Sequence, residues 1–133
     1  MSPDQRPSLT DWRDNPRQRG RQKYHNVRCV HQGMTFDSKA ELKRWLDLSM
    51  LLKAREIKDL RRQVPYLLIP KTARPSGGHE RECTYIADFV YVDRNGRTVV
   101  EDVKGGGLQT DVFTLKRKLM LFVHGIEIRV VKT

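Results

Sequence analysis

The sequence has little cysteine, few acidic residues and no long apolar run. Its 133 residues include two cysteines, which are too few for a disulfide framework and favour a reducing compartment. No apolar run approaches the ~20 residues that a membrane-spanning helix needs. The N-terminus is polar and charged, unlike a secretory signal. We therefore expect a soluble cytoplasmic protein with no membrane partner.

The two cysteines also end two His-x3-Cys motifs, His25 to Cys29 and His79 to Cys83. Two cysteines and two histidines are the ligand types of a structural zinc site. The motifs lie far apart in the sequence, however, and His79 follows a stretch of proline and glycine that is typical of a loop. Ordinary buried or surface residues are the favoured interpretation.

Acidic residues are outnumbered by lysine and arginine, 16 to 26, which gives a formal net charge of +10. An excess of this size favours an anionic polymer as partner, because Lys and Arg release condensed counterions when they bind a phosphate backbone. A solvated surface on a basic protein is the alternative. The hydrophobic residues, 38% of the chain, are enough for one core, so we expect a single folded domain.

The N-terminal segment combines prolines, arginines and glutamines without hydrophobic periodicity. This composition predicts a disordered basic tail over residues 1–22 and a folded domain over residues 23–133. Arg21 and Lys23, where the two meet, are candidate contacts to a DNA backbone. A solvated extension explains the same residues equally well.

Residues 85–105 predict the central element of the domain, a hairpin of two strands rich in Val, Ile, Phe and Tyr. The turn is expected at residues 93–97, whose sequence is Asp-Arg-Asn-Gly-Arg. Asp88 lies in the first strand between apolar neighbours, where burying a carboxylate is costly. Side chains alternate between the faces of a strand, so Asp102 and Lys104 share one face of the second strand.

The length of the turn decides which residue lies opposite Asp88. A two-residue turn would place Asp88 on the face of Glu101. A three-residue connection, with Gly96 in the left-handed bulge position, would place Asp88 opposite Asp102. Asp at the first turn position and Gly at the fourth favour the second geometry. We therefore expect Asp88 and Asp102 to share a face with Lys104, and Glu101 to point the other way.

Carboxylates that face each other on neighbouring strands repel unless a cation lies between them. Asp88 and Asp102 supply hard oxygen ligands, which suit Mg2+ or Mn2+. The sequence therefore predicts a divalent metal site on this face of the hairpin.

A helix is predicted from Ser38, because Ser38-x-x-Glu41 before a run of Leu and Trp is a capping-box pattern. One interpretation of Glu41 is therefore a side chain that bonds back to its own helix terminus. At about 100° per residue, however, Glu41 falls on the apolar stripe of Trp45, Leu48 and Leu52 and points toward the core. A role in the metal site is the other interpretation, and the two roles are compatible.

Three further segments complete the first half of the domain. Residues 26–36 predict a short hairpin, with its turn at Gln32-Gly33. Residues 63–69 predict a strand, and Pro65 favours an edge position or a bulge for it. Residues 71–83 predict a polar loop, which is either a plain connection or a flap over a substrate.

A second helix is predicted between a cap at Thr110 and Gly125, followed by a strand over residues 126–131. The apolar residues on one side of this helix are Leu115, Leu119, Phe122 and Val123. Lys116 and Lys118 are candidate contacts to a DNA backbone, with a solvated helix face as the alternative. The whole order of elements predicts an α/β fold with a mixed central sheet flanked by helices.

The acids and their order along the chain resemble the core of the PD-(D/E)xK nuclease superfamily. Its two elements stand here as Ala87-Asp88 and Asp102-Val103-Lys104. A wider run of residues 23–24, 36–41 and 103–105 is similar to a family of small phage-encoded proteins among the Holliday-junction-resolvase-like endonucleases. The resemblance covers nearly all of the chain beyond the N-terminal tail and implies a restriction-endonuclease-like core.

The resemblance also implies an activity, a Mg2+- or Mn2+-dependent endonuclease that hydrolyses DNA phosphodiester bonds. Branched DNA and Holliday junctions are the candidate substrates. Asp88, Asp102, the backbone carbonyl of Val103 and Glu41 would hold the metal ion. Lys104 would position or help deprotonate the attacking water. If the chain is phage-encoded, its compartment is the host cytoplasm.

Gln63 matches a Gln of the phage family and is a candidate supporting residue that would orient Glu41 or a metal-bound water, unless it is only a polar strand start. A homodimer is expected if two strands of a junction are cut together, although no exposed apolar stripe in the sequence identifies the interface. A non-catalytic nucleic-acid-binding module with an inactive nuclease fold is the alternative function. A structural or host-interaction protein would leave both the charge and the acids unexplained.

Overall fold

The computed structural model describes residues 27–106 and 109–132. The predicted tail lies outside the described residues, together with Arg21, Lys23 and His25. No helix in the described part of the chain is long and apolar enough to cross a membrane.

The described helices and strands follow one another in the predicted order. They are β1 (Cys29–His31), β2 (Met34–Phe36), α1 (Lys39–Lys53), β3 (Lys58–Ile69), β4 (Thr72–Ala73), β5 (His79–Glu80), β6 (Cys83–Val92), β7 (Thr98–Lys104), α2 (Asp111–His124) and β8 (Arg129–Lys132). The prediction of a loop over residues 71–83 is wrong, because β4 and β5 pair with each other there as a small hairpin.

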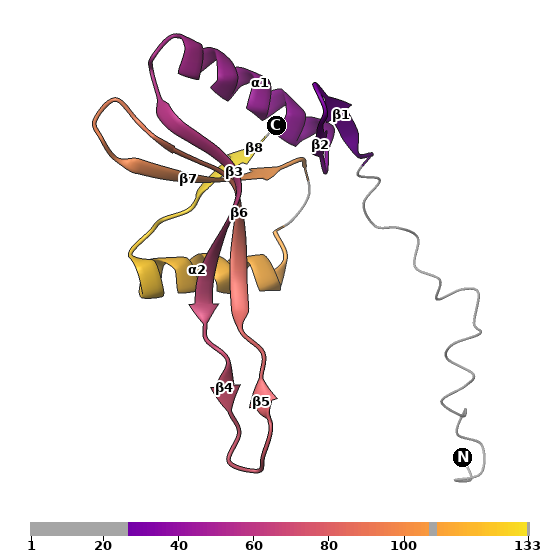
Figure 1. Cartoon of the computed structure of the whole chain (residues 1–133), viewed down its shortest axis with the longest axis vertical. Coiled ribbons are helices and arrows are strands. Elements are labelled where there is room, and N and C mark those ends of the chain that lie inside the picture. The colour runs from indigo at the N-terminus through magenta and orange to yellow at the C-terminus, as the bar shows by residue number, and fades with distance from the viewer. Residues whose placement is uncertain (1–26, 107–108, 133) are drawn as a thin grey trace, which may run out of the picture.

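The central sheet has the strand order β3, β6, β7, β8. The first two pairings are antiparallel and β7 pairs with β8 in parallel, so the sheet is mixed, as predicted. The helices α1 and α2 lie on opposite sides of it (Figure 1). β3 is an edge strand, which lets Pro65 lack an N–H without breaking a ladder on both sides.

Each helix begins at the predicted capping residue. The hydroxyl of Ser38 accepts a hydrogen bond from the backbone N–H of Glu41 at 3.2 Å, and the hydroxyl of Thr110 accepts one from Phe113 at 3.1 Å. α2 ends at Gly125, whose φ of 66° is the left-handed conformation that glycine adopts at low cost. These local signals in the sequence are therefore confirmed.

The apolar sides of the helices are oriented differently from each other. In α1 the predicted stripe faces the sheet at Leu48, although Leu52 is 40% exposed. In α2 the buried residues are Phe113 and Met120. Of the apolar residues that the sequence singles out in α2, Leu119 packs against this core, whereas Leu115 and Phe122 face outward and are 59% and 88% exposed.

The turn between β6 and β7 has the predicted three-residue form. The backbone N–H of Asp93 donates to the carbonyl of Arg97 at 2.9 Å, and Gly96 has a φ of 76°. The resulting register pairs Phe89 with Glu101, which confirms the predicted alignment of the two strands. The strand pairing ends at Phe89 and Glu101, one residue before Asp88 would lie opposite Asp102.

β6 changes faces at Asp88. Along a regular strand Ala87 and Phe89 would share a face, but Ala87 packs in the cluster under α2 and Phe89 in the cluster under α1. β3 changes faces at the same level, because Leu60 packs under α1 and Val64 under α2. Gln63, directly before Val64, has a φ of 51°, a backbone conformation that a regular strand does not contain. The two strands therefore twist together where the candidate site lies.

Candidate active site

The predicted acids meet at the end of the sheet where β7 ends and α1 begins. α1 contributes Glu41, β6 contributes Asp88 and β7 contributes Asp102. The start of α1 lies against the end of β7, since a Cβ added at Gly105 would lie 3.8 Å from the Cβ of Ala40. Glu41 and Asp102 are 8% and 6% exposed, so two of the three acids are almost fully buried.

Asp88 bonds to β7 where the strand ladder has ended. Its Oδ2 accepts a hydrogen bond from the backbone N–H of Val103 at 2.7 Å, and its Oδ1 accepts a long one from Gln63 Nε2 at 3.4 Å. Burial raises the pKa of the Asp88 carboxyl group to about 8, against the lowering effect of the Val103 bond. The charges of Glu41 and Asp102 raise it further, so both acids lie close enough to repel the Asp88 carboxylate.

The two oxygens of Asp102 have different partners. Oδ1 accepts a hydrogen bond from the Tyr85 hydroxyl at 2.9 Å, and Oδ2 lies 3.0 Å from Lys104 Nζ. The latter contact has the distance of an ion pair but not the geometry of a hydrogen bond, and Oδ2 has no other donor among the described residues. The Lys104 ammonium also lies 4.1 Å from the centre of the Phe113 ring. The prediction that Asp102 and Lys104 share a face is confirmed.

Tyr85 is a site residue that sequence reasoning does not single out. Burial raises the pKa of its hydroxyl, and the Asp102 charge raises it further, so the hydroxyl keeps its proton and donates at neutral pH. One signal in the sequence points to it. Tyr85 and Ala87 are on alternate positions of one strand, and a tyrosine in a buried row needs a partner for its hydroxyl.

Glu41 fits both interpretations of the sequence. Its Oε2 accepts a hydrogen bond from the backbone N–H of Asp37 at 3.3 Å, so the side chain does reach back over the helix terminus. It is also buried and acts on the charge of Asp88. Capping therefore places the Glu41 carboxylate beside the other acids.

Gln63 contacts Asp88 rather than Glu41, which corrects the predicted partner. Lys116 and Lys118 both lie on α2 but differ in position. Lys116 is half-buried and lines a hollow of about 350 Å³ with Tyr85 and neighbouring residues of α2, whereas Lys118 is exposed. Of the two lysines, Lys116 is thus the one on the side of α2 that faces the site.

Glu101 lies on the other face of β7, as predicted, and is completely buried. Arg44 binds both of its carboxylate oxygens, with Nε distances of 3.0 and 3.1 Å, and the Tyr91 hydroxyl donates to Oε1 at 3.2 Å. Hydrogen bonding to Glu101 raises the pKa of Arg44. Arg44 stands three positions after Glu41, which is the helical spacing of side chains on one face and the signal that could have identified it.

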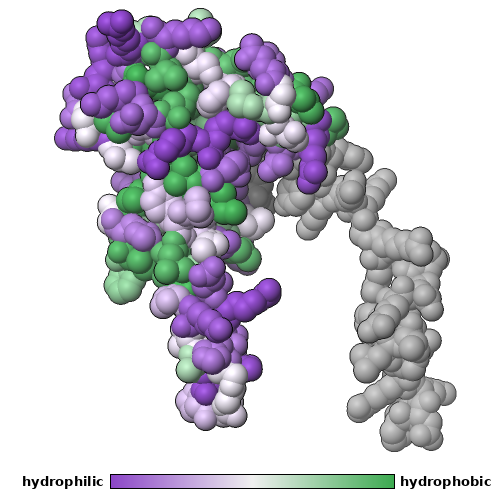
Figure 2. All heavy atoms as spheres, in the orientation of Figure 1, coloured by the Kyte–Doolittle hydropathy of each residue, from purple (hydrophilic) through white to green (hydrophobic). Residues whose placement is uncertain are grey.

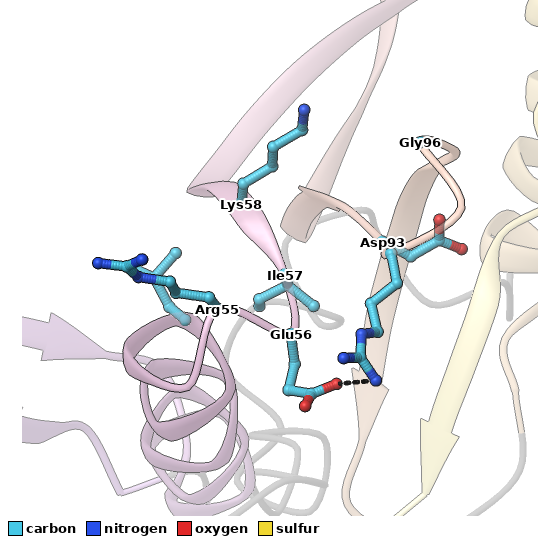
Figure 3. Close-up of a pocket in the computed structure, with 8 residues that line it drawn as sticks. Arg55, Glu56, Ile57, Lys58, Asp93 and Gly96 are labelled. Carbon is cyan, nitrogen blue, oxygen red and sulfur yellow. Dashed lines mark ion pairs between the residues drawn. The ribbon is translucent and has the colours of Figure 1, made fainter.

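A larger hollow lies at the opposite end of the sheet, between the end of α1 and the β6–β7 turn (Figure 3). Its volume is about 540 Å³, and an ion pair between Arg94 and Glu56 of 3.1 Å crosses its wall. None of the predicted site residues lines it. The acids and the hollow are therefore separate features of the domain.

The acids supply the ligand types of a hard cation, namely carboxylate oxygens and a neighbouring backbone carbonyl. Within the described ranges, no group of three or more Asp, Glu, His or Cys side chains could hold a metal ion as it stands. The buried Oδ2 of Asp102 and the repulsion on Asp88 are nevertheless both features that a bound cation would relieve. Cys29 and Cys83 are free thiols.

Comparison with protein families gives one result. Residues 21–130 match the family model described as "Protein of unknown function (DUF1064)". No curated protein and no solved structure matches the chain.

Proposed function

The chain belongs to the DUF1064 family, a family described as one of unknown function, and from the geometry of the acidic site we propose that it is a metal-dependent endonuclease with a restriction-endonuclease-like core. The proposal rests on one observation. Glu41, Asp88 and Asp102 are brought together from three elements in a buried place, with Lys104 3.0 Å from Asp102.

This arrangement is costly for a protein without a cation. Burial and like charges together raise the pKa of Asp88 to about 8, so ionised acids held this close together destabilise the folded state. Perturbed acids of this kind are concentrated at functional sites. A divalent cation would offset the repulsion between the carboxylates and would explain why the fold keeps them together.

In the proposed mechanism Asp88, Asp102, the carbonyl of Val103 and Glu41 would hold Mg2+ or Mn2+. When bound, such an ion polarises the phosphoryl oxygen and stabilises the charge that develops on it. Lys104 would position the attacking water or, in its neutral form, help to remove the proton of that water; as the ammonium ion it would offset charge on the scissile phosphate. Gln63 donates to Asp88 Oδ1 and so orients that carboxylate.

DNA is the proposed substrate because the formal net charge of +10 favours a polyanion. Lys116, on the side of α2 that faces the site, is the best placed of the candidate backbone contacts, and Lys118, Arg21 and Lys23 complete the set. Branched DNA, including Holliday junctions, is the proposed preferred form. The family resemblance is its support.

A non-catalytic DNA-binding module is the second candidate, and one observation favours it. The Lys104 ammonium group lies 3.0 Å from Oδ2 of Asp102 and the Tyr85 hydroxyl donates to Oδ1, so the charge of this carboxylate is offset without a metal ion. Such a module would bind DNA through its basic surface without cutting it.

Cleavage assays separate the two candidates. Wild type, Lys104→Ala, Asp88→Asn and the control Lys43→Ala are incubated with a labelled four-way junction or a matched linear duplex, in Mg2+, Mn2+ or chelator. Lys43 is an exposed lysine of α1 two positions after Glu41, so its loss changes the charge but not the site. We expect metal-dependent cutting by wild type and control only. Tight binding without cutting of either substrate in any metal would instead support the binding module.

A homodimer belongs to the same proposal, because paired cuts in opposing strands need two sites. The sequence alone identifies no interface for such a dimer, and the outer side of α2 is the surface that we propose for it. Val112, Leu115 and Phe122 are 64%, 59% and 88% exposed on the outer side of α2. In Figure 2 apolar residues gather at the level of α2, above a polar extension.

A further inference from the structure

The strands that carry the candidate site continue beyond the body of the protein as a protruding arm, defined here as residues 70–82. β4 and β5 pair in it through Thr72 with Glu80 and Ala73 with His79. Every residue of the arm is exposed. Figure 1 shows the arm extending away from both helices.

The tip of the arm is a turn closed by hydrogen bonds. The backbone N–H of Arg74 donates to the carbonyl of Gly78 at 3.0 Å, and that of Gly77 donates back to Arg74 at 3.0 Å. The Arg74 side chain folds over the turn, with Nε 3.2 Å from the carbonyl of Gly77. Gly78 has a φ of 74°, a left-handed backbone conformation that favours glycine. The arm therefore has a defined shape before any partner binds.

The arm is fixed in direction relative to the site. β6 runs from Cys83 through Asp88, and β3 pairs with it on both sides of Gln63. About ten residues separate Asp88 from the tip, which at ~3.3 Å per residue is roughly 33 Å. One turn of B-form DNA spans about 34 Å. The arm thus reaches about as far from the acids as one helical turn of a duplex.

The chemistry of the arm suits a duplex groove. Lys71 and Arg81 lie exposed at the base of its two strands, with Glu82 next to Arg81 in the sequence, whereas Arg74 is engaged at the tip and pairs with Glu80 at 3.5 Å. The residues at its base present apolar surface, with Leu67 and Ile86 45% and 52% exposed. The major groove, about 12 Å wide, admits a two-stranded ribbon, in which cations contact phosphates and apolar groups contact thymine methyls.

We propose that the arm lies along intact duplex DNA on one side of the cleaved phosphate and binds its backbone about one turn away. This inference rests on the proposed function and makes it more specific. The substrate must carry at least about ten base pairs of duplex on the arm side of the cut. A short end, a gap or a single strand in that place would leave the arm without a partner.

Two variants test the arm. In the first, residues 72–80 are replaced by Asn-Gly, a two-residue hairpin turn, which removes the arm and keeps β3 paired with β6. In the second, Lys71→Ala is combined with Arg81→Ala. The control combines Lys43→Ala with Lys53→Ala, which removes the same charge from exposed positions of α1. Affinity is measured by fluorescence anisotropy in chelator, on duplexes of 8 and 24 base pairs, and cleavage is measured in Mg2+ and Mn2+.

We expect wild type and control to bind the longer duplex more tightly and the shortened variant to lose this preference. Loss of Lys71 and Arg81 should reduce the slope of log affinity against log salt by about 1.8, or about 0.9 for each phosphate contact. An equal reduction in the control would overturn the inference, because general charge would then explain it. So would a shortened variant that becomes monomeric while wild type is dimeric, since the arm would be a contact between copies.

The two levels of the proposal fail differently. If wild type binds DNA through the arm but cuts nothing in any metal, the nuclease proposal is wrong and the arm stands. If wild type cuts, and all variants bind both duplexes as wild type does, the nuclease stands and the arm does not bind DNA.

Discussion

Asp88 is a carboxylic acid whose ionisation the folded structure opposes. Burial, with the charges of Glu41 and Asp102, raises its pKa from 3.8 to about 8. Between these pH values Asp88 keeps its proton in the folded protein, whereas the same side chain has released it in the unfolded chain. The contribution of Asp88 to the free energy of unfolding is therefore fully present below about pH 4 and is lost as the pH rises toward 8. In chelator the melting temperature should therefore fall across this range.

Asp88→Asn should remove this part of the pH dependence, because an amide does not ionise. Each 1 kcal/mol involved corresponds to about 4 °C in melting temperature for a domain of this size. The measurement is thermal unfolding of wild type and Asp88→Asn between pH 4 and 9, with and without Mg2+. At pH 8 the cation should stabilise wild type and not the variant. Parallel curves for the two proteins would show that Asp88 is not the titrating group.

Tyr85 acts on Asp102 through a single hydrogen bond of 2.9 Å. Tyr85→Phe keeps the buried ring and removes the donor, so Asp102 Oδ1 loses its partner while the fold persists. If Asp102 holds the cation, we expect about a 10- to 100-fold loss of apparent Mg2+ affinity, the usual effect of removing a partner of a metal ligand. The Mg2+ dependence of cleavage measures it, and high Mg2+ should restore much of the rate.

The matched control for that substitution is Tyr66→Phe. Tyr66 is half-buried in β3 and packs edge-on against His124, with 5.6 Å between the ring centres. Its variant should keep the wild-type Mg2+ dependence. Equal weakening in both variants would mean that ring packing, and not the Asp102 bond, is responsible.

Arg44 and Glu101 form a buried ion pair on the face of β7 that α1 covers, opposite the face of Asp102. Among the described residues, Arg44→Ala leaves the completely buried Glu101 carboxylate with the Tyr91 hydroxyl as its one donor, and should lower the free energy of unfolding by about 3–5 kcal/mol. Urea unfolding measures this, and the exposed neighbour Lys43→Ala should stay within about 0.5 kcal/mol of wild type. A small effect at Arg44 would show that the pair is easily replaced by solvent.

At the scale of the element, the central hairpin was the most predictable part of the molecule. Asp93 and Gly96 determine the turn, and the turn determines the register, because pairing has to continue from it in steps of one residue. The helix caps at Ser38 and Thr110 also depend on a few neighbouring residues, so the sequence predicts them equally well. Each of these features depends on a few neighbouring residues, which is why the sequence alone was sufficient.

The face change at Asp88 and the arm could not be predicted in this way. Gln63 has a positive φ, which glutamine rarely adopts, so the sequence predicts regular alternation of side chains through this position. The arm has no apolar alternation, because neither of its faces is covered. It is held by hydrogen bonds at the tip, which leave no periodic pattern. The sequence also does not show which side of α2 faces the sheet, because an apolar stripe has the same pattern whether it packs on the sheet or faces solvent.

The twist at Gln63 predicts a specific pattern of tolerance. Gln63→Val should destabilise the domain by about 1–3 kcal/mol, because a β-branched residue is strained at a φ of 51°, whereas Gln63→Gly should fold normally. Urea unfolding distinguishes them. Gln63→Gly also removes the amide that bonds Asp88, so its cleavage rate reports the amide and not the backbone. Equal stability of the Val and Gly variants would show that the twist does not depend on this residue.

At the scale of the whole molecule, the outer side of α2 is the surface that best fits a second copy. Val112, Leu115 and Phe122 lie three and seven residues apart, which places them on one side of the helix. All three are more than half exposed. Exposed apolar residues grouped along one helix mark contact surfaces more often than scattered ones do.

Phe122→Glu should therefore convert a dimer into a monomer, because a charge would be buried at the centre of the contact. Light scattering at micromolar concentrations measures the mass, and Met50→Glu on α1, which is 70% exposed, is the matched control. If the dimer is needed for paired cuts, the Phe122 variant should nick one strand of a junction and fail to cut both in one binding event. A wild type that stays monomeric at all concentrations would contradict the dimer and leave single-strand nicking as the activity to expect.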